Sequence, residues 1–282
     1  MGNKNPYFIT EPTVISFSGG RTSAYMLWKC LEAHDGMLPD EAIVCFSNTG
    51  KEEEATLKFV NDCAVNWKVN IHWLEYRDNE QKFEVVTYET ASRNGEPFEI
   101  LIRKRKFLPN PTARFCTVEL KVRTIHRYLK SIGIESAVNM IGIRADEQRR
   151  LKKISNNDYG HQWEKYAPLG LDNVTKKTVG DFWKQQPFDL ELFNNNGVTM
   201  HGNCDLCFLK GGNQIQSLIQ EKPERAIWWA KMETLAQTSD VTYGDGARFR
   251  KDRPSYQQMY DNAFAQKTLS FSDETIECFC GD

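Results

Sequence analysis

The sequence predicts an α/β protein with an open, mostly parallel twisted sheet and helices on both faces. Four apolar runs are expected to be strands, at residues 13–17, 42–46, 71–76 and 137–143. Three helices are expected between them, at residues 22–33, 52–67 and 117–129. Strands that alternate with helices are typical of a parallel sheet. Continuous apolar runs, rather than alternating ones, indicate strands that are covered on both faces.

The change in composition after residue 150 indicates two parts. We expect residues 1–150 to form the α/β core and residues 151–282 to form an elaboration that packs on it. In the second part, Ile215, Leu218 and Ile219 recur at helical spacing, which predicts one long helix over residues 213–235. The following segment, from residue 240 onward, is expected to be polar. It contains four basic residues close together, at Arg248, Arg250, Lys251 and Arg253.

The composition excludes several classes of protein. Of 282 residues, 40% are hydrophobic and 26% are charged, as in an ordinary soluble protein. The 36 basic and 38 acidic residues give a net charge of -2, which argues against broad coating of nucleic acid but allows a local basic patch. The run at residues 103–106 is such a patch, or a solvated face. We find no secretory signal and no membrane span, and expect a cytoplasmic protein with reduced thiols.

A glycine turn follows the first predicted strand, with the sequence Ser-Gly-Gly-Arg-Thr-Ser at residues 18–23. Two glycines permit positive φ and a close backbone approach. The helix that follows presents unpaired N–H groups and a partial positive charge, to which hydroxyl and guanidinium donors add. These features predict an anion cradle for pyrophosphate. The alternative is a tight turn with a Ser or Thr cap, because neither the Walker A pattern nor G-x-G-x-x-G is present.

This turn resembles the SGGxxS PP-loop of the phosphoadenosine phosphosulfate (PAPS) reductase-like family, in the adenine nucleotide α-hydrolase-like superfamily. Arg21 stands where Lys is most common. The segment at residues 46–50 resembles F-x-D-T-G, with Asn48 for Asp, and residues 141–147 resemble the G-x-R-x-x-E segment. Residues 114–121 and the C-x-x-C at 204–207 resemble segments of the iron-sulfur branch. The resemblance spans residues 12–212 and implies a nucleotide at the carboxyl ends of the strands.

The resemblance implies a site for ATP or a related adenosine nucleotide with Mg²⁺. The residues carried over to it are Ser18, Gly19, Gly20, Arg21, Thr22, Ser23, Asn48, Thr49, Gly50, Arg144 and Glu147. Arg21 and Arg144 are the expected catalytic cations, and Arg144 suits phosphate or sulfate through paired N–H donors. Asp146 or Glu147 could hold Mg²⁺. Taken without the resemblance, residues 48–50 are a turn and residues 144–150 are a solvated charged face.

The eight cysteines fall into two groups. Cys30, Cys45 and Cys63 are expected to be buried structural residues. The resemblance implies that Cys116, Cys204 and Cys207 hold a [4Fe-4S] cluster, for which zinc is the alternative. Family members with a cluster have a second cysteine where this chain has Phe115, so the fourth ligand falls to Cys278, Cys280 or an exogenous group. Alternatively, Cys278 or Cys280 is a nucleophile that attacks a sulfonucleotide, or the end of the chain has no function.

Three functions remain open at this point. The leading hypothesis is a PP-loop enzyme that adenylylates a substrate, releases pyrophosphate and supports sulfur transfer to a nucleic acid or small molecule. It resembles the ATP-pyrophosphatase component of DNA phosphorothioation and the tRNA thiolation enzymes. The runner-up is a sulfonucleotide reductase that forms sulfite with a thioredoxin-like reductant. The third is a non-catalytic nucleotide or nucleic-acid binding module. The sulfur donor, the acceptor and the oligomeric state are not predicted.

Overall fold

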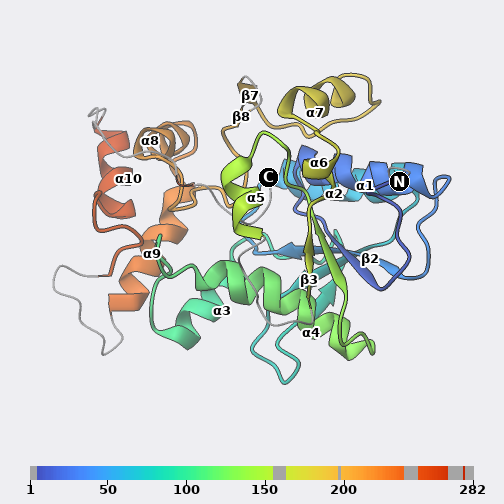
Figure 1. Cartoon of the computed structure of the whole chain (residues 1–282). Coiled ribbons are helices and arrows are strands. Elements are labelled where there is room, and N and C mark those ends of the chain that lie inside the picture. The colour runs from blue at the N-terminus through green and yellow to red at the C-terminus, as the bar shows by residue number, and fades with distance from the viewer. Residues whose placement is uncertain (1–4, 155–162, 196–197, 238–246, 266–275, 277–282) are drawn as a thin grey trace.

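The computed structural model describes residues 5–154, 163–195, 198–237, 247–265 and 276 (Figure 1). Its centre is a six-stranded sheet in the order β4-β3-β2-β1-β5-β6. The strands are β1 (Thr13–Ser16), β2 (Ala42–Asn48), β3 (Ile71–Glu75), β4 (Glu84–Val86), β5 (Val138–Ile141) and β6 (Lys165–Tyr166). All neighbouring pairs are parallel except β3 and β4, which are antiparallel. The predicted α/β fold with a mostly parallel sheet is therefore confirmed.

Helices cover both faces of the sheet (Figure 1). One face packs against α1 (Arg21–Ala33) and α2 (Glu54–Trp67), with α6 (Pro168–Leu171) and α7 (Lys176–Trp183) outside them. The other face packs against α4 (Arg123–Ser131). Successive residues of β1 divide between the two faces, since Val14 lies in the α4 cluster and Ile15 lies in the α1–α2 cluster. This alternation is why the strands read as continuous apolar runs.

A second apolar core lies beside the sheet and unites residues from both halves of the chain. It is built from α3 (Glu96–Arg105), α8 (Gly212–Glu221), α9 (Arg225–Gln237) and α10 (Tyr256–Phe264). Trp229 is completely buried at its centre, as expected for a packing residue. The remaining described elements are the π-helix η1 (Thr117–Val122), α5 (Gln148–Ile154) and the two-stranded ribbon of β7 (Asn194–Asn195) and β8 (Val198–Thr199). None of the helices in the described ranges is long and apolar enough to cross a membrane.

Three local predictions were wrong in detail. The single helix expected over residues 213–235 is two helices, because Pro223 between them lacks an N–H and disrupts a helix interior. The helix expected over residues 117–129 begins as a π-helix, η1 (Thr117–Val122), before α4. The polar character expected after residue 240 fails for residues 247–265. There Phe249 and Tyr256 belong to the second core, and Arg253 is only 5% exposed.

Candidate functional site

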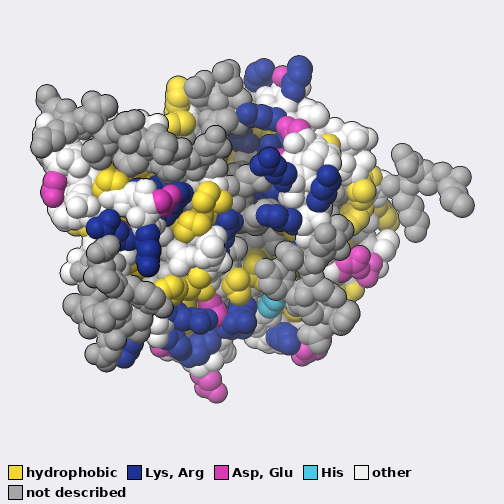
Figure 2. Space-filling model, turned by 60° about the vertical axis from the view of Figure 1, so that its left-hand side comes forward, with side chains coloured by type: hydrophobic (Ala, Val, Ile, Leu, Met, Phe, Trp, Pro, Cys, Tyr) yellow, Lys and Arg dark blue, Asp and Glu magenta, His cyan; other side chains and the backbone are white. Residues whose placement is uncertain are grey.

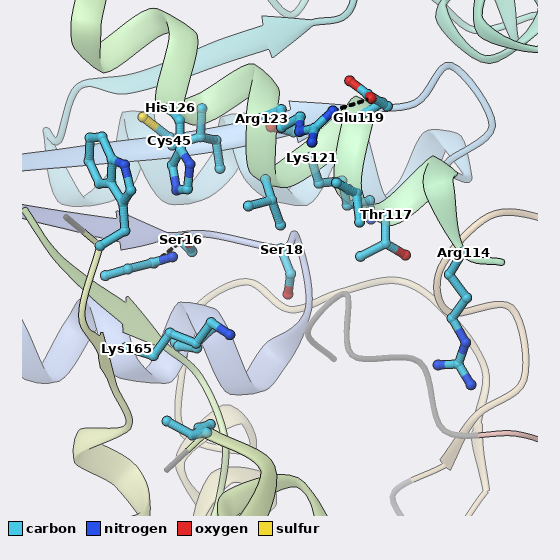
Figure 3. Close-up of a pocket in the computed structure, with 18 of the residues that line it drawn as sticks. Ser16, Ser18, Cys45, Arg114, Thr117, Glu119, Lys121, Arg123, His126 and Lys165 are labelled. Atoms are coloured by element: carbon cyan, nitrogen blue, oxygen red, sulfur yellow. Dashed lines mark hydrogen bonds and ion pairs between the residues drawn. The ribbon is translucent and has the colours of Figure 1, made fainter. Parts of the chain in front are cut away.

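A cavity of about 810 Å³ lies at the carboxyl ends of β1, β2 and β5, on the α4 side of the sheet (Figure 3). The glycine turn contributes Ser18 and Ser23 to its lining, and β2 contributes Ser47. Gly142, just after β5, and η1 complete this part of the wall. The cavity has the size of a small-molecule site. Its position at the strand ends is where open α/β sheets bind ligands.

The glycine turn keeps its shape through hydroxyl contacts. The Ser18 N–H donates to Ser23 Oγ at 3.1 Å, the two serine hydroxyls lie 2.9 Å apart, and Ser23 Oγ donates to the Gly20 carbonyl at 3.0 Å. Gly19 has φ +81°, and a Cβ there would lie 2.7 Å from Thr56. Helix α1 begins directly afterwards with no side-chain cap at Gly20. Its positive end therefore lies beside the cavity, as an anion cradle requires.

Arg21 does not point into this cavity. Its Nε and Nη2 atoms bind the Asp189 carboxylate at 2.7 Å and 2.9 Å, and Nη2 also donates to the Leu190 carbonyl at 2.6 Å. The Trp183 indole donates to the Arg21 carbonyl at 3.0 Å. In this structure Arg21 therefore joins the glycine turn to the segment after α7.

The segment after β2 also turns away from the cavity. Asn48 is completely buried, and its amide donates to Glu75 Oε1 at 2.6 Å and to the Ser92 carbonyl at 2.8 Å. Its Oδ1 accepts from the Gly50 N–H at 3.0 Å. Thr49 Oγ1 lies 3.4 Å from Cys204 Sγ. Residues 48–50 therefore brace the end of β2 and connect it to the C-x-x-C loop.

Arg144 and Glu147 lie next to the glycine turn. The Arg144 Nη1 donates to Thr22 Oγ1 at 2.9 Å, and its backbone N–H donates to Glu147 Oε2 at 2.9 Å. The Arg144 Nε pairs with Asp146 at 3.0 Å. Glu147 Oε1 pairs with Arg150 at 2.5 Å. Both carboxylates that were candidates for Mg²⁺ are thus paired with arginines.

Arg150 is a cavity residue that the sequence analysis missed. It lines the cavity and is 3% exposed. In the sequence it stands in a run of basic residues on a helix, which favoured a solvated face. Only its contact with Glu147 and its burial distinguish it from its neighbour Arg149, which is exposed.

The lining of the cavity is strongly basic. Seven lysine or arginine residues line it, against a single carboxylate, Glu119, among the described lining residues. The seven are Arg105, Arg114, Lys121, Arg123, Arg150, Lys153 and Lys165. In Figure 3, Lys165 and Arg114 lie at opposite ends with Ser18 between them, and basic side chains are frequent on the face shown in Figure 2. Such a wall favours an anionic ligand.

Glu119 organises part of this basic wall. It is 5% exposed and pairs with Arg105 at 2.5 Å, Arg123 at 2.6 Å and Arg127 at 3.1 Å. Burial by itself would raise the pKa of Glu119, but the arginines lower it below its ordinary value. One carboxylate thus holds three cations together, and two of them line the cavity.

The other end of the cavity carries a stacked ring pair. His126 and Trp163 have ring centroids 4.3 Å apart and planes 10° from parallel. Burial, helped by Lys130 and Lys165, lowers the pKa of His126 to about 4. The imidazole is therefore neutral at pH 7. The ring pair offers a flat apolar surface at this end of the cavity, beside the charge of Lys165.

Three of the candidate metal cysteines share the second apolar core. Cys207 is buried in it, and Cys116 and Cys204 pack against it. Burial, followed by the nearby Glu52, raises the pKa of the Cys204 thiol well above its ordinary value. Within the described ranges, no group of three or more His, Cys, Asp or Glu side chains is arranged to hold a metal. The candidate fourth ligands, Cys278 and Cys280, lie outside the described residues, so the four-cysteine metal site stays a prediction.

The remaining cysteines divide between confirmed burial and the undescribed end of the chain. Cys30, Cys45 and Cys63 are completely buried, as predicted, and Cys45 also lines the cavity. Cys278 and Cys280 lie outside the described residues. The preceding Ile276 donates its N–H to the Leu209 carbonyl at 2.8 Å, two residues beyond Cys207.

Comparison with known proteins identifies the family. Residues 12–197 match the phosphoadenosine phosphosulfate reductase domain. A protein of Escherichia phage lambda, the "Uncharacterized nin region protein ORF290", is 30% identical over 211 residues, which cover 72% of this chain and 67% of the relative. The chain belongs to the phosphoadenosine phosphosulfate reductase domain family.

One solved structure found by comparison is the U34-tRNA thiolase NcsA from Methanococcus maripaludis with its [4Fe-4S] cluster. It is 14% identical, with a TM-score of 0.39 and coverage of 84% of this chain and 77% of that chain. A likeness this distant has no bearing on the reaction of the present protein.

Proposed function

We propose that the cavity binds an adenosine nucleotide and that the protein uses ATP to activate a substrate with release of pyrophosphate. The observation that carries this proposal is the meeting of the glycine turn with a cavity lined by seven basic residues. A polyphosphate needs both features, since backbone N–H groups at a helix start bind its oxygens and cations balance its charge. Membership of a family named for a nucleotide-dependent enzyme supports it.

The cavity offers different surroundings to the two ends of such a nucleotide. The Ser18 hydroxyl and the backbone N–H groups at the start of α1 supply donors for the phosphates. The stacked pair of His126 and Trp163 offers a flat apolar wall to the base. We therefore orient the nucleotide with its phosphates at the glycine turn and its base toward Trp163.

The proposed reaction is a displacement at the α-phosphorus. An oxygen of the substrate attacks this phosphorus, the bond to the oxygen that bridges to the β-phosphate breaks, and pyrophosphate leaves with both electrons of that bond. The protein contributes positioning and stabilisation of the leaving charge. The adenylylated substrate, which is a nucleic acid or a small molecule, can then accept sulfur. A cluster held by the predicted cysteine ligands would supply sulfur binding.

The test is ATP binding by calorimetry, followed by an assay of pyrophosphate release with water, tRNA or DNA as acceptor. Ser18→Ala should weaken ATP binding about tenfold, because it removes one hydrogen bond to a charged group. Ser131→Ala is the matched control, since Ser131 is an exposed serine at the end of α4. Failure of the wild-type protein to bind ATP at millimolar concentration would contradict the proposal.

The second candidate is a sulfonucleotide reductase, which the family match itself favours. A thiolate of Cys278 or Cys280 would attack the sulfur of the sulfonucleotide, the bond from sulfur to the phosphate oxygen would break, and the nucleoside phosphate would leave. A thioredoxin-like dithiol would then reduce the resulting thiosulfonate, release sulfite and become a disulfide. The hydrogen bond from the Ile276 N–H to the Leu209 carbonyl places Ile276, two residues before Cys278, next to the segment that follows the C-x-x-C loop. Sulfite release from PAPS or adenosine phosphosulfate, with dithiothreitol, distinguishes this reaction from pyrophosphate release.

A further inference from the structure

Arg150 has two buried donor atoms without a partner. The side chain belongs to α5, lines the cavity and is 3% exposed. Its Nη1 pairs with Glu147 Oε1 at 2.5 Å. Its Nε and Nη2 atoms are buried and have no hydrogen-bond partner. Buried guanidinium donors are seldom left unpaired, since an unsatisfied charged donor is costly.

The two unpaired atoms form one edge of the guanidinium plane. The N–H bonds of Nε and Nη2 point the same way, which lets them bind two oxygens of one anion side by side. The protein itself shows this mode at Arg21, where the same two atoms hold the Asp189 carboxylate at 2.7 Å and 2.9 Å. Arg150 presents the same edge without a carboxylate on it.

A short series of contacts fixes Arg150 relative to the glycine turn. Glu147 holds Arg150 through Oε1 and the Arg144 backbone N–H through Oε2, at 2.9 Å. Arg144 in turn donates to Thr22 Oγ1 at 2.9 Å. Ser47, which is 6% exposed and lines the same cavity, also has a buried hydroxyl without a partner. The unpaired donors thus belong to the cavity that the glycine turn closes.

We propose that Arg150 binds a tetrahedral oxyanion of the nucleotide side-on, through Nε and Nη2. The anion is a phosphate or a sulfuryl group. This inference rests on the proposed nucleotide site and adds an anion-binding residue outside the segments that predicted that site. Glu147 then acts as the positioning residue that holds Arg150, rather than as a metal ligand.

The experiment compares Arg150→Ala, Arg150→Lys and Arg149→Ala by calorimetry. Arg149 is the matched control because it has the same charge on the same helix but is exposed. Arg150→Ala should weaken binding of ATP or PAPS about 10- to 100-fold and leave adenosine binding unchanged. Arg149→Ala should stay within about threefold of wild type. Arg150→Lys should remain weak, since a lysine has no paired edge for a side-on contact.

Separate outcomes test the inference and the proposed function. If Arg150→Ala binds ATP and PAPS each with the same affinity as wild type, the role of Arg150 is overturned. The nucleotide site itself is then unaffected. If the wild type binds no nucleotide, the proposed function fails, and inorganic pyrophosphate and sulfate become the probes. If pyrophosphate or sulfate binds to wild type and binds more weakly to Arg150→Ala, the anion site at Arg150 is retained. If neither anion binds, the anion site is overturned. Arg150→Lys can still pair with Glu147, so it serves if Arg150→Ala does not fold. If Arg150→Ala weakens PAPS binding more than ATP binding, the anion at Arg150 is the sulfuryl group, and equal losses for the two ligands assign it to a phosphate that both carry.

Discussion

Asp205→Asn should destabilise the protein strongly, because Asp205 neutralises a buried lysine. The carboxylate Oδ2 lies 2.9 Å from Lys51 Nζ, and the two side chains are 11% and 9% exposed. The other oxygen accepts from the Trp229 indole at 2.8 Å and from the Leu206 N–H at 2.7 Å. This network joins the segment after β2 to the C-x-x-C loop.

The size of the effect follows from what the substitution leaves behind. Asparagine keeps the volume and one oxygen for Trp229, so the loss falls mainly on the Lys51 ammonium. Among the described residues, that buried ion would keep the face of Trp228, 5.1 Å away, as its electrostatic partner. Removal of one partner from a buried pair costs about 3–5 kcal/mol. The double variant Lys51→Met with Asp205→Asn should recover most of this loss, because no charge remains buried.

Urea unfolding followed by circular dichroism measures these differences in the free energy of unfolding. Asp62→Asn is the control, because its pair with Lys58, at 2.8 Å, lies near the surface. It should cost no more than about 1 kcal/mol. If Asp205→Asn unfolds within about 1 kcal/mol of wild type, or if the double variant is less stable than Asp205→Asn, the buried-charge argument is wrong.

Three further predictions follow from single residues. Gly19→Ala should lower stability by at least about 1–2 kcal/mol, since φ is +81° and the new Cβ would press on Thr56 at 2.7 Å; an unchanged melting temperature would contradict this. Burial and nearby lysines lower the pKa of His126 from 6.5 to about 4. Between pH 6.5 and pH 4, His126 is therefore protonated in the unfolded chain but neutral in the folded one. The contribution of His126 to stability, read as the difference in unfolding free energy between wild type and His126→Phe, should fall by about 2–3 kcal/mol as the pH falls through this window, and the same pH slope in both proteins would refute the assignment. Burial raises the pKa of Glu233 from 4.5 to about 7, against two backbone hydrogen bonds, so the folded state keeps a proton that the unfolded state loses. The contribution of Glu233 to the free energy of unfolding should decline as the pH rises from 4.5 to 7. Urea titrations at these two pH values should show a smaller decline for Glu233→Gln than for wild type.

The sheet could be predicted because its signals are local. Each central strand is a short apolar run in the sequence, followed within a few residues by apolar residues at helical spacing. The strands β1, β2, β3 and β5 therefore lie where expected. The short edge strands β4 and β6 carry no such pattern and depend on pairing with a neighbour. Pro223 was a local signal for the break between α8 and α9, but the apolar spacing on both sides obscured it.

The glycine turn was predictable, but the partners of the site residues were not. Arg21 was expected at the phosphates, yet it pairs with Asp189, 168 residues further along the chain. No local pattern indicates that contact. Arg150 differs from Arg149 through its burial and its contact with Glu147, which a run of basic residues in the sequence does not reveal. Residues that gather from distant segments, such as Lys165, likewise require the fold before they can be assigned to the cavity.

A crystal structure with a non-hydrolysable ATP analogue tests the central claim most directly. The account predicts the phosphates of the analogue at Ser18 and Ser23, with two oxygens of one phosphate paired to Nε and Nη2 of Arg150 and the base toward Trp163. A nucleotide bound elsewhere on the protein, or a cavity that stays free of nucleotide at saturating concentration, would contradict it.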